Sequence, residues 1–127
     1  MIDLLKKLTK EQRDNTHIET PPRYLMFSVK DEKAQAFNLP FLQTNVDLAI
    51  RTLASSVTNP DSVVSKYPQD FTLYKLGTFD EITGAIVTLE RPEYIIRADE
   101  LLIAIQKQNA MNLKKEPEKN ADQTVQS

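Results

Sequence analysis

Apolar and polar side chains alternate along residues 23–31, where Leu25, Phe27 and Val29 fall on one side of an extended chain. A period of two is typical of a half-buried β-strand. The pattern therefore predicts a strand over this segment.

A second alternation follows after the short segment EKAQ. Residues 36–44 place Phe37, Leu39 and Phe41 on one face of a second strand. Pro40 has no N–H to donate to a sheet ladder, so we expect this strand to lie at an edge or to carry a bulge.

The periodicity changes to helical over residues 45–58. The apolar positions are Val46, Ala49, Ile50, Leu53, Ala54 and Val57. They form one stripe of an amphipathic helix. Thr44 with Asp47 resembles a capping box, and Asn59-Pro60 ends the helix. Asp61 is a candidate cap for one further turn.

Residues 70–79 predict another strand, which a hairpin loop connects to the segment AIVTL. Asp80 is suited to open the turn, and Gly84 to supply a positive φ that closes it. We expect Pro92 to break the returning strand. The segment EYIIR then forms either a fifth short strand or the approach to a second amphipathic helix, capped by Asp99.

This order of elements favours the α+β class, with an antiparallel sheet of four to five strands and one packed central helix. We divide the chain into a leader and connector (1–22) with a short amphipathic helix, a globular domain (23–113) and a disordered tail (114–127). One helix covers only one face of the sheet. We expect the other face to be covered by the terminal helix, a second subunit or a ligand.

Composition limits the classes of function. The chain has 127 residues, no cysteine, a net charge of −2 and no apolar run long enough for a membrane span. Its sequence pI of about 5.4 argues mildly against avid duplex binding. These features fit a protein of a reducing cytoplasm without a membrane partner.

Residues suited to catalysis are scarce. The single histidine, His17, lies in the connector, and the sequence has no phosphate-binding glycine loop, nucleophile elbow or metal-ligand spacing. We therefore expect no enzymatic activity, no metal and no cofactor.

Single-stranded nucleic acid is bound by aromatic faces that stack bases and by scattered cations that track phosphates, without a high pI. The candidates are Tyr24, Lys30, Lys33, Arg51, Lys66, Tyr67, Tyr74, Lys75, Arg91, Tyr94 and Arg97. The predicted binding residues among them are Lys30, Lys33, Arg51, Lys66, Tyr67, Tyr74, Lys75 and Arg91. A plain structural role is the simpler interpretation, with Phe71, Leu73 and Phe79 in the core and Tyr74 half-buried.

The segments that carry these patterns resemble a known family. They contain Phe27, Val29 and Asp31, then Pro40 and Phe41, then Asn59, Pro60 and Asp61, and finally a block of Pro68, Asp70, Phe71, Thr72, Leu73, Tyr74, Leu76, Gly77, Phe79, Asp80, Thr83 and Gly84. In this order they resemble the small nonstructural proteins of microviruses, the gokushovirus group of single-stranded DNA phages. The resemblance covers about residues 25–90 and leaves out both ends of the chain.

The resemblance implies a non-enzymatic phage protein that binds DNA in the host cytoplasm and shifts replication from duplex to single-stranded genome synthesis. Two functions follow. The first is a single-stranded-DNA-binding protein that forms a homodimer. The second is an interaction module that recruits or blocks a host or phage replication protein.

Overall fold

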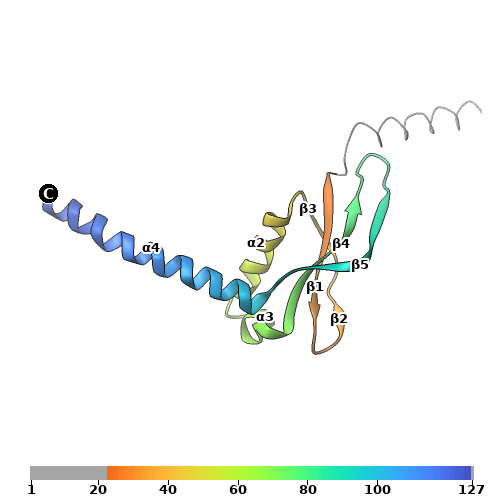
Figure 1. Ribbon diagram of the computed structural model, residues 1–127, viewed down its shortest axis with the longest axis horizontal. Helices are drawn as coiled ribbons and strands as arrows, with labels where there is room; N and C mark the ends of the chain where they lie inside the picture. The colour runs from red at the N-terminus through yellow and green to blue at the C-terminus, as the bar shows by residue number, and fades with distance from the viewer. Residues whose placement is uncertain (1–22, 127) are drawn as a thin grey trace, which may run out of the picture.

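The structure is a computed structural model and describes residues 23–126 (Figure 1). Its elements are β1 (Tyr24–Asp31), β2 (Ala36–Phe37), β3 (Phe41–Gln43), α2 (Val46–Val57), α3 (Val63–Lys66), the 3₁₀ turn η1 (Pro68–Asp70), β4 (Phe71–Phe79), β5 (Ile86–Arg97) and α4 (Ala98–Gln126). The α+β class with an antiparallel sheet is confirmed. The leader and His17 lie outside the described residues.

The sheet has five strands in the order β2–β1–β4–β5, and β3 also pairs with β1. β2 pairs with the end of β1, at Lys30 and Asp31, whereas β3 pairs with its start, at residues 25–27. β2 and β3 are therefore two short pieces of one edge, separated at residues 38–40. The expectation that Pro40 would mark an edge or a bulge is confirmed.

The break at residues 38–40 corrects one prediction about the second strand. Phe41 stacks on the buried Phe27 at 5.9 Å between ring centroids, but Phe37 pairs with Lys30 on the opposite face. Leu39 is 90% exposed. The three residues do not share a face, because the chain leaves the ladder between them and the alternation restarts.

One face of the sheet holds the core. Ala49, Leu53 and Val57 from α2 are buried there, together with Ala98 and Leu101 from the start of α4. Both helices thus pack on the same side of the sheet (Figure 1). α2 forms as its apolar stripe predicts, because every residue of the stripe lies in the core or packs against it.

Two helix caps differ from those predicted. Asn45, not Thr44, caps α2: its side-chain oxygen accepts a hydrogen bond from the Leu48 N–H at 2.9 Å. Ser62, not Asp61, caps α3 through the Val64 N–H at 3.1 Å. Each cap lies one residue later than expected, and both are residue types that satisfy free N–H groups at a helix start.

The hairpin between β4 and β5 forms as predicted. The Asp80 carboxylate accepts hydrogen bonds from the N–H groups of Ile82 and Thr83, and Gly84 has a φ of 76°. Gly77 is required for a different reason. A Cβ atom at this position would lie 2.2 Å from the Val87 carbonyl oxygen, so only glycine allows the strands to approach this closely.

The prediction that Pro92 breaks the returning strand is wrong. β5 continues through Pro92 to Arg97, and the register with β4 shifts around Leu76, where residues 89–92 have no partner in the ladder. A proline is tolerated in such an irregularity because no ladder hydrogen bond is lost. The segment EYIIR is the end of this strand.

α4 begins at Ala98, so Asp99 lies in its first turn and is not its predicted cap. The helix continues to Gln126, over the segment for which composition predicts disorder. Disorder of that segment in solution stays a prediction. Within residues 23–126, none of the helices combines the length and the apolar character that crossing a membrane requires.

Candidate nucleic-acid interface

The face of the sheet opposite the helices is the first candidate surface. Strand alternation directs Phe27 and Val29 toward the core, so Ser28 and Lys30 point to the other side. Ser28 is buried although no described helix packs there. Larger side chains from neighbouring strands therefore cover it.

Three aromatic rings lie side by side across this face. Phe37 and Tyr74 have ring centroids 5.6 Å apart at an interplanar angle of 66°, and Tyr74 and Tyr94 follow at 6.2 Å and 87°. These are favourable edge-to-face geometries. Phe37 is 42% and Tyr94 50% exposed, so the rings remain accessible. We name Phe37, Tyr74 and Tyr94 the aromatic ladder.

A small polar group fixes the middle of the aromatic ladder. The Tyr74 hydroxyl donates a hydrogen bond of 2.8 Å to Glu32, and the Lys30 ammonium lies 3.5 Å from the same carboxylate. Lys30 also lies 5.5 Å from the centroid of the Phe37 ring. The hydrogen bond to Glu32, followed by burial, raises the pKa of Tyr74. The hydroxyl therefore stays protonated at neutral pH and acts as the donor.

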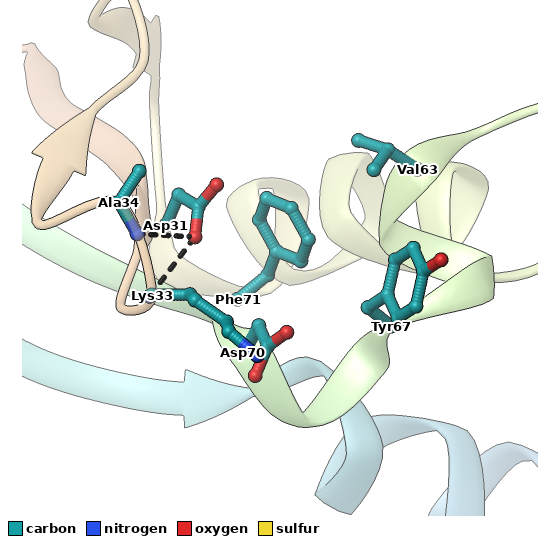
Figure 2. Close-up of a pocket in the computed structure, with 7 residues that line it drawn as sticks. All are labelled: Asp31, Lys33, Ala34, Val63, Tyr67, Asp70 and Phe71. Carbon is teal, nitrogen blue, oxygen red and sulfur yellow. Dashed lines mark hydrogen bonds between the residues drawn. The ribbon is translucent and has the colours of Figure 1, made fainter.

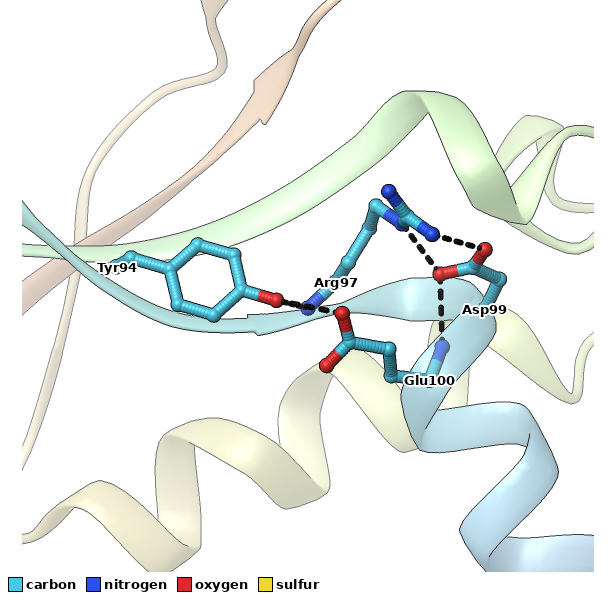
Figure 3. Close-up of polar contacts among 4 residues, drawn as sticks. All are labelled: Tyr94, Arg97, Asp99 and Glu100. Atoms are coloured by element: carbon cyan, nitrogen blue, oxygen red, sulfur yellow. Dashed lines mark hydrogen bonds and ion pairs between the residues drawn. The ribbon is translucent and has the colours of Figure 1, made fainter.

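A second polar group holds Tyr94 where β5 meets α4 (Figure 3). The Tyr94 hydroxyl donates to Glu100 at 2.9 Å and accepts from the Arg97 N–H at 3.1 Å. Burial, followed by the hydrogen bond to Glu100, raises the pKa of Tyr94. The ring is thus anchored at its hydroxyl, while half of the side chain stays exposed.

Arg97 is engaged in the same group and is not free for a phosphate. Its guanidinium donates two hydrogen bonds to Asp99, at 2.6 and 2.8 Å (Figure 3). This bidentate contact raises the pKa of Arg97 and lowers the pKa of Asp99. Lys30, by contrast, places its ammonium over a ring of the aromatic ladder, that of Phe37.

A pocket of about 440 Å³ lies at the end of the sheet, on the core side (Figure 2). Its lining residues are Asp31, Lys33, Ala34, Val63, Tyr67, Asp70 and Phe71. The β1–β2 turn forms one wall and α3 the other, with the buried Phe71 between them. This turn also leads directly to Phe37, so it separates the pocket from the aromatic ladder.

The structure brings together two subsets of the predicted binding residues. Lys30 and Tyr74 lie on the face of the aromatic ladder. Lys33 and Tyr67 line the pocket, and the exposed Lys66 precedes Tyr67 in the chain.

The other three predicted residues lie apart. Lys75 pairs with Phe27, so it faces the helix-bearing side and not the side of Tyr74. Arg51 is exposed on α2, and Arg91 lies in the irregular segment of β5. Whether any of these three residues binds nucleic acid stays a prediction.

Phe37 is the member of the aromatic ladder that the sequence interpretation missed. Its position relative to Phe41 suggested the core, because the alternation was extended across Pro40. The available signal was Pro40 itself: a break in the ladder allows the residues before it to change face. Tyr94 was among the aromatic candidates but not among the predicted binding residues.

A family model described as Phage ORF5 protein matches residues 24–101. The chain belongs to the Phage ORF5 protein family. No curated protein and no solved structure gives a significant match. The match to the Phage ORF5 family begins at the first residue of β1 and ends at the buried Leu101, so it covers the sheet, α2 and the first turn of α4. All three rings of the aromatic ladder and the whole pocket lie within the part that defines the family.

Among residues 23–113, whose side chains the structure describes, no three His, Cys, Asp or Glu side chains gather in an arrangement that holds a metal ion. The groups available in this Phage ORF5 protein are aromatic rings, one nearby ammonium and a mixed polar pocket. Such groups bind by stacking and hydrogen bonding.

Proposed function

We propose that this phage protein binds single-stranded DNA through the aromatic ladder, without enzymatic activity, in the host cytoplasm. The observation that supports the proposal is the row of three rings, fixed in position yet accessible, on a sheet face that no described helix covers. Successive bases stack on such rings whatever their identity.

The aromatic ladder also gives a reason to prefer single strands. In a duplex, the base faces are stacked inside the helix and cannot reach a flat protein surface. A single strand offers every base face, and one stacked base contributes roughly 1–3 kcal/mol. This preference agrees with the role that the microvirus resemblance implies, in which the protein shifts replication from duplex to single-stranded genome synthesis.

Electrostatics has a smaller part in the proposed binding. The net charge is −2, and the Lys30 ammonium forms an ion pair with the Glu32 carboxylate. We therefore expect a shallow salt dependence, because each phosphate contact on a single strand contributes only about 0.7 to the slope of log K against log salt.

The direct test is a titration of the protein into a fluorescently labelled oligonucleotide, single-stranded or as a duplex, at about 50 and about 200 mM salt. We expect the single strand to bind more tightly at both salt concentrations. Lys30→Ala should lower the slope by roughly 0.7. The matched control is Lys107→Ala, on an exposed position of α4, which should leave the slope unchanged. Equal affinity for both nucleic acids, or no affinity, contradicts the proposal.

A second candidate function is protein interaction, and a separate surface favours it. The hairpin between β4 and β5 exposes Ile82, Ile86 and Val87, each by more than half. Exposed apolar side chains that lie together mark interaction surfaces. The partner is a phage or host replication protein in this reading, and a second copy of the chain if the protein forms the expected homodimer.

Sedimentation velocity of the wild type and of Val87→Ser addresses the homodimer. A dimer that dissociates in the variant places the contact on the hairpin. If the wild type is a monomer, the expectation of a homodimer is wrong, and the partner of the hairpin is a different protein.

A further inference from the structure

The pocket beside the β1–β2 turn combines an aromatic wall with polar groups that have no partner among the described residues. Tyr67 is 53% exposed. Its hydroxyl, the Lys33 ammonium and the Asp70 carboxylate make no hydrogen bond or ion pair with any described residue. Figure 2 shows Tyr67 on one side of Phe71 and Lys33 with Asp70 on the other.

The second acid of the pocket has a structural role. The Asp31 carboxylate accepts hydrogen bonds from the N–H groups of Lys33 and Ala34, at 3.0 and 3.1 Å, and thereby closes the β1–β2 turn. The Lys33 ammonium, a donor, and the Asp70 carboxylate, an acceptor, therefore remain for a ligand, together with the ring and hydroxyl of Tyr67. A volume of about 440 Å³ lies within the range of small-molecule sites.

We propose that this pocket binds one guanine base of the single strand, an inference that rests on the proposed function. An ionised carboxylate only accepts hydrogen bonds, through two oxygens. Guanine offers two adjacent donors on its Watson–Crick edge, N1–H and the N2 amino group, whereas each other base offers its amino or imino donor beside an acceptor. Asp70 therefore matches guanine best.

The remaining two groups fit the same base. Lysine is a frequent partner of the guanine acceptors O6 and N7, and O6 lies next to N1 on the ring. Lys33 is thus suited to the acceptor side of the base that Asp70 holds by its donor side. Tyr67 supplies the stacking surface, as aromatic residues do for unstacked bases in single strands. The DNA strand reaches the pocket by passing from the aromatic ladder around the β1–β2 turn.

The experiment compares an oligothymidylate with the same oligomer carrying one central guanine, by fluorescence anisotropy. We expect the guanine to raise the affinity roughly tenfold. Asp70→Asn, which keeps the shape but replaces one acceptor oxygen by a donor, should abolish this gain. The matched control Asp61→Asn changes an exposed acid outside the pocket and should retain it.

Tyr67 provides a second pair of variants. Tyr67→Ala should lose the gain from guanine, whereas Tyr67→Phe, which keeps the ring, should retain most of it. Melting curves of all variants confirm that each one folds.

The outcomes separate the two proposals. If both oligomers bind the wild type equally, or if Asp70→Asn keeps the preference, the guanine site is wrong and single-strand binding stands. If neither oligomer binds, the proposed function is wrong and the guanine site falls with it.

Discussion

At the scale of single residues, Tyr74 is the centre of the proposed interface. It contacts the ring of Phe37 on one side and that of Tyr94 on the other, and its hydroxyl is held by Glu32. A ring fixed in this way loses little conformational freedom when a base stacks on it. More of the stacking free energy is then available for binding.

Removing this ring gives the first prediction. Tyr74→Ala should weaken binding of a single-stranded oligonucleotide about tenfold or more, because it deletes one stacking surface and releases its two neighbours. Tyr74→Phe should bind nearly as the wild type, since it loses only the hydroxyl. Anisotropy titrations measure the affinities, and melting curves exclude a folding defect. Normal folding and wild-type binding of Tyr74→Ala would show that the aromatic ladder has only a structural role.

The contact between Arg97 and Asp99 gives a prediction about pH. The pKa of Asp99 is lower in the folded protein than its ordinary value, chiefly because of the hydrogen bonds from Arg97. Ionised Asp99 therefore stabilises the fold above about pH 4, and this contribution disappears as the pH falls through the lowered folded-state pKa. The side chains of Arg97 and Asp99 are 45% and 26% exposed, so solvent screens the ion pair and we expect a small effect.

Denaturant unfolding of the wild type and of Asp99→Asn, measured between about pH 7 and about pH 2, checks this. The difference in the free energy of unfolding should be constant near neutral pH and should shrink in acid. A difference that grows as the pH falls would reverse the assigned sign.

At the scale of elements, the sequence predicts most where one periodicity runs without interruption. The stripe of α2 and the alternation of β1 were predicted correctly, because the apolar side chains of each pattern all lie in the core or against it. The strands that contain a proline were predicted less well. Pro40 moved Phe37 to the other face, and Pro92 did not end β5, since an edge strand with a shifted register accommodates it.

Leu53 tests the packing of α2. It is 1% exposed in the centre of the core, and Leu53→Ala should lower the free energy of unfolding by roughly 2–5 kcal/mol. The control on the same helix is Arg51→Ala, at an exposed position, with an expected effect within about 0.5 kcal/mol. Chemical denaturation measures both. A loss below about 0.5 kcal/mol for Leu53→Ala would mean that α2 is not packed against the sheet.

At the scale of the whole molecule, α4 consists of a packed start and a long projecting part (Figure 1). Leu101, Leu102 and Ile105 contact the core, whereas every side chain from Gln106 to Leu113 is exposed. A helix without tertiary contacts is only marginally stable in water. The projecting part therefore depends on its own helix propensity, which Pro117 lowers.

Deletion of residues 115–127 should consequently leave the melting temperature unchanged. Amide hydrogens after Lys114 should exchange without protection, as the composition of this segment predicts. Hydrogen exchange and thermal unfolding of the full and shortened chains measure the two quantities. Protected amides in this segment, or a lower melting temperature after its removal, would show that it contacts the folded part.

The candidate sites were predicted only in part for a reason that also belongs to this scale. Tyr74 was identified as a half-buried aromatic residue on a strand, which alternation alone indicates. The pocket joins residues 31–34 with residues 63–71, and the aromatic ladder joins three strands. Both depend on strand order and register, which local patterns do not determine.

The order of the strands has a consequence for the synthesis of the chain. β1 lies inside the sheet, but its main partner β4 is encoded much later. Ser28 is therefore translated well before Tyr74, the residue with which it pairs. At ordinary rates of translation this interval is on the order of seconds. During that time β2 and β3 protect one edge of β1 at the ribosome, while its other edge has no partner from the sheet. The nascent protein is therefore most prone to aggregate before Phe79 has emerged. Folding completes only after β5 has paired with β4 and the start of α4 has joined the core.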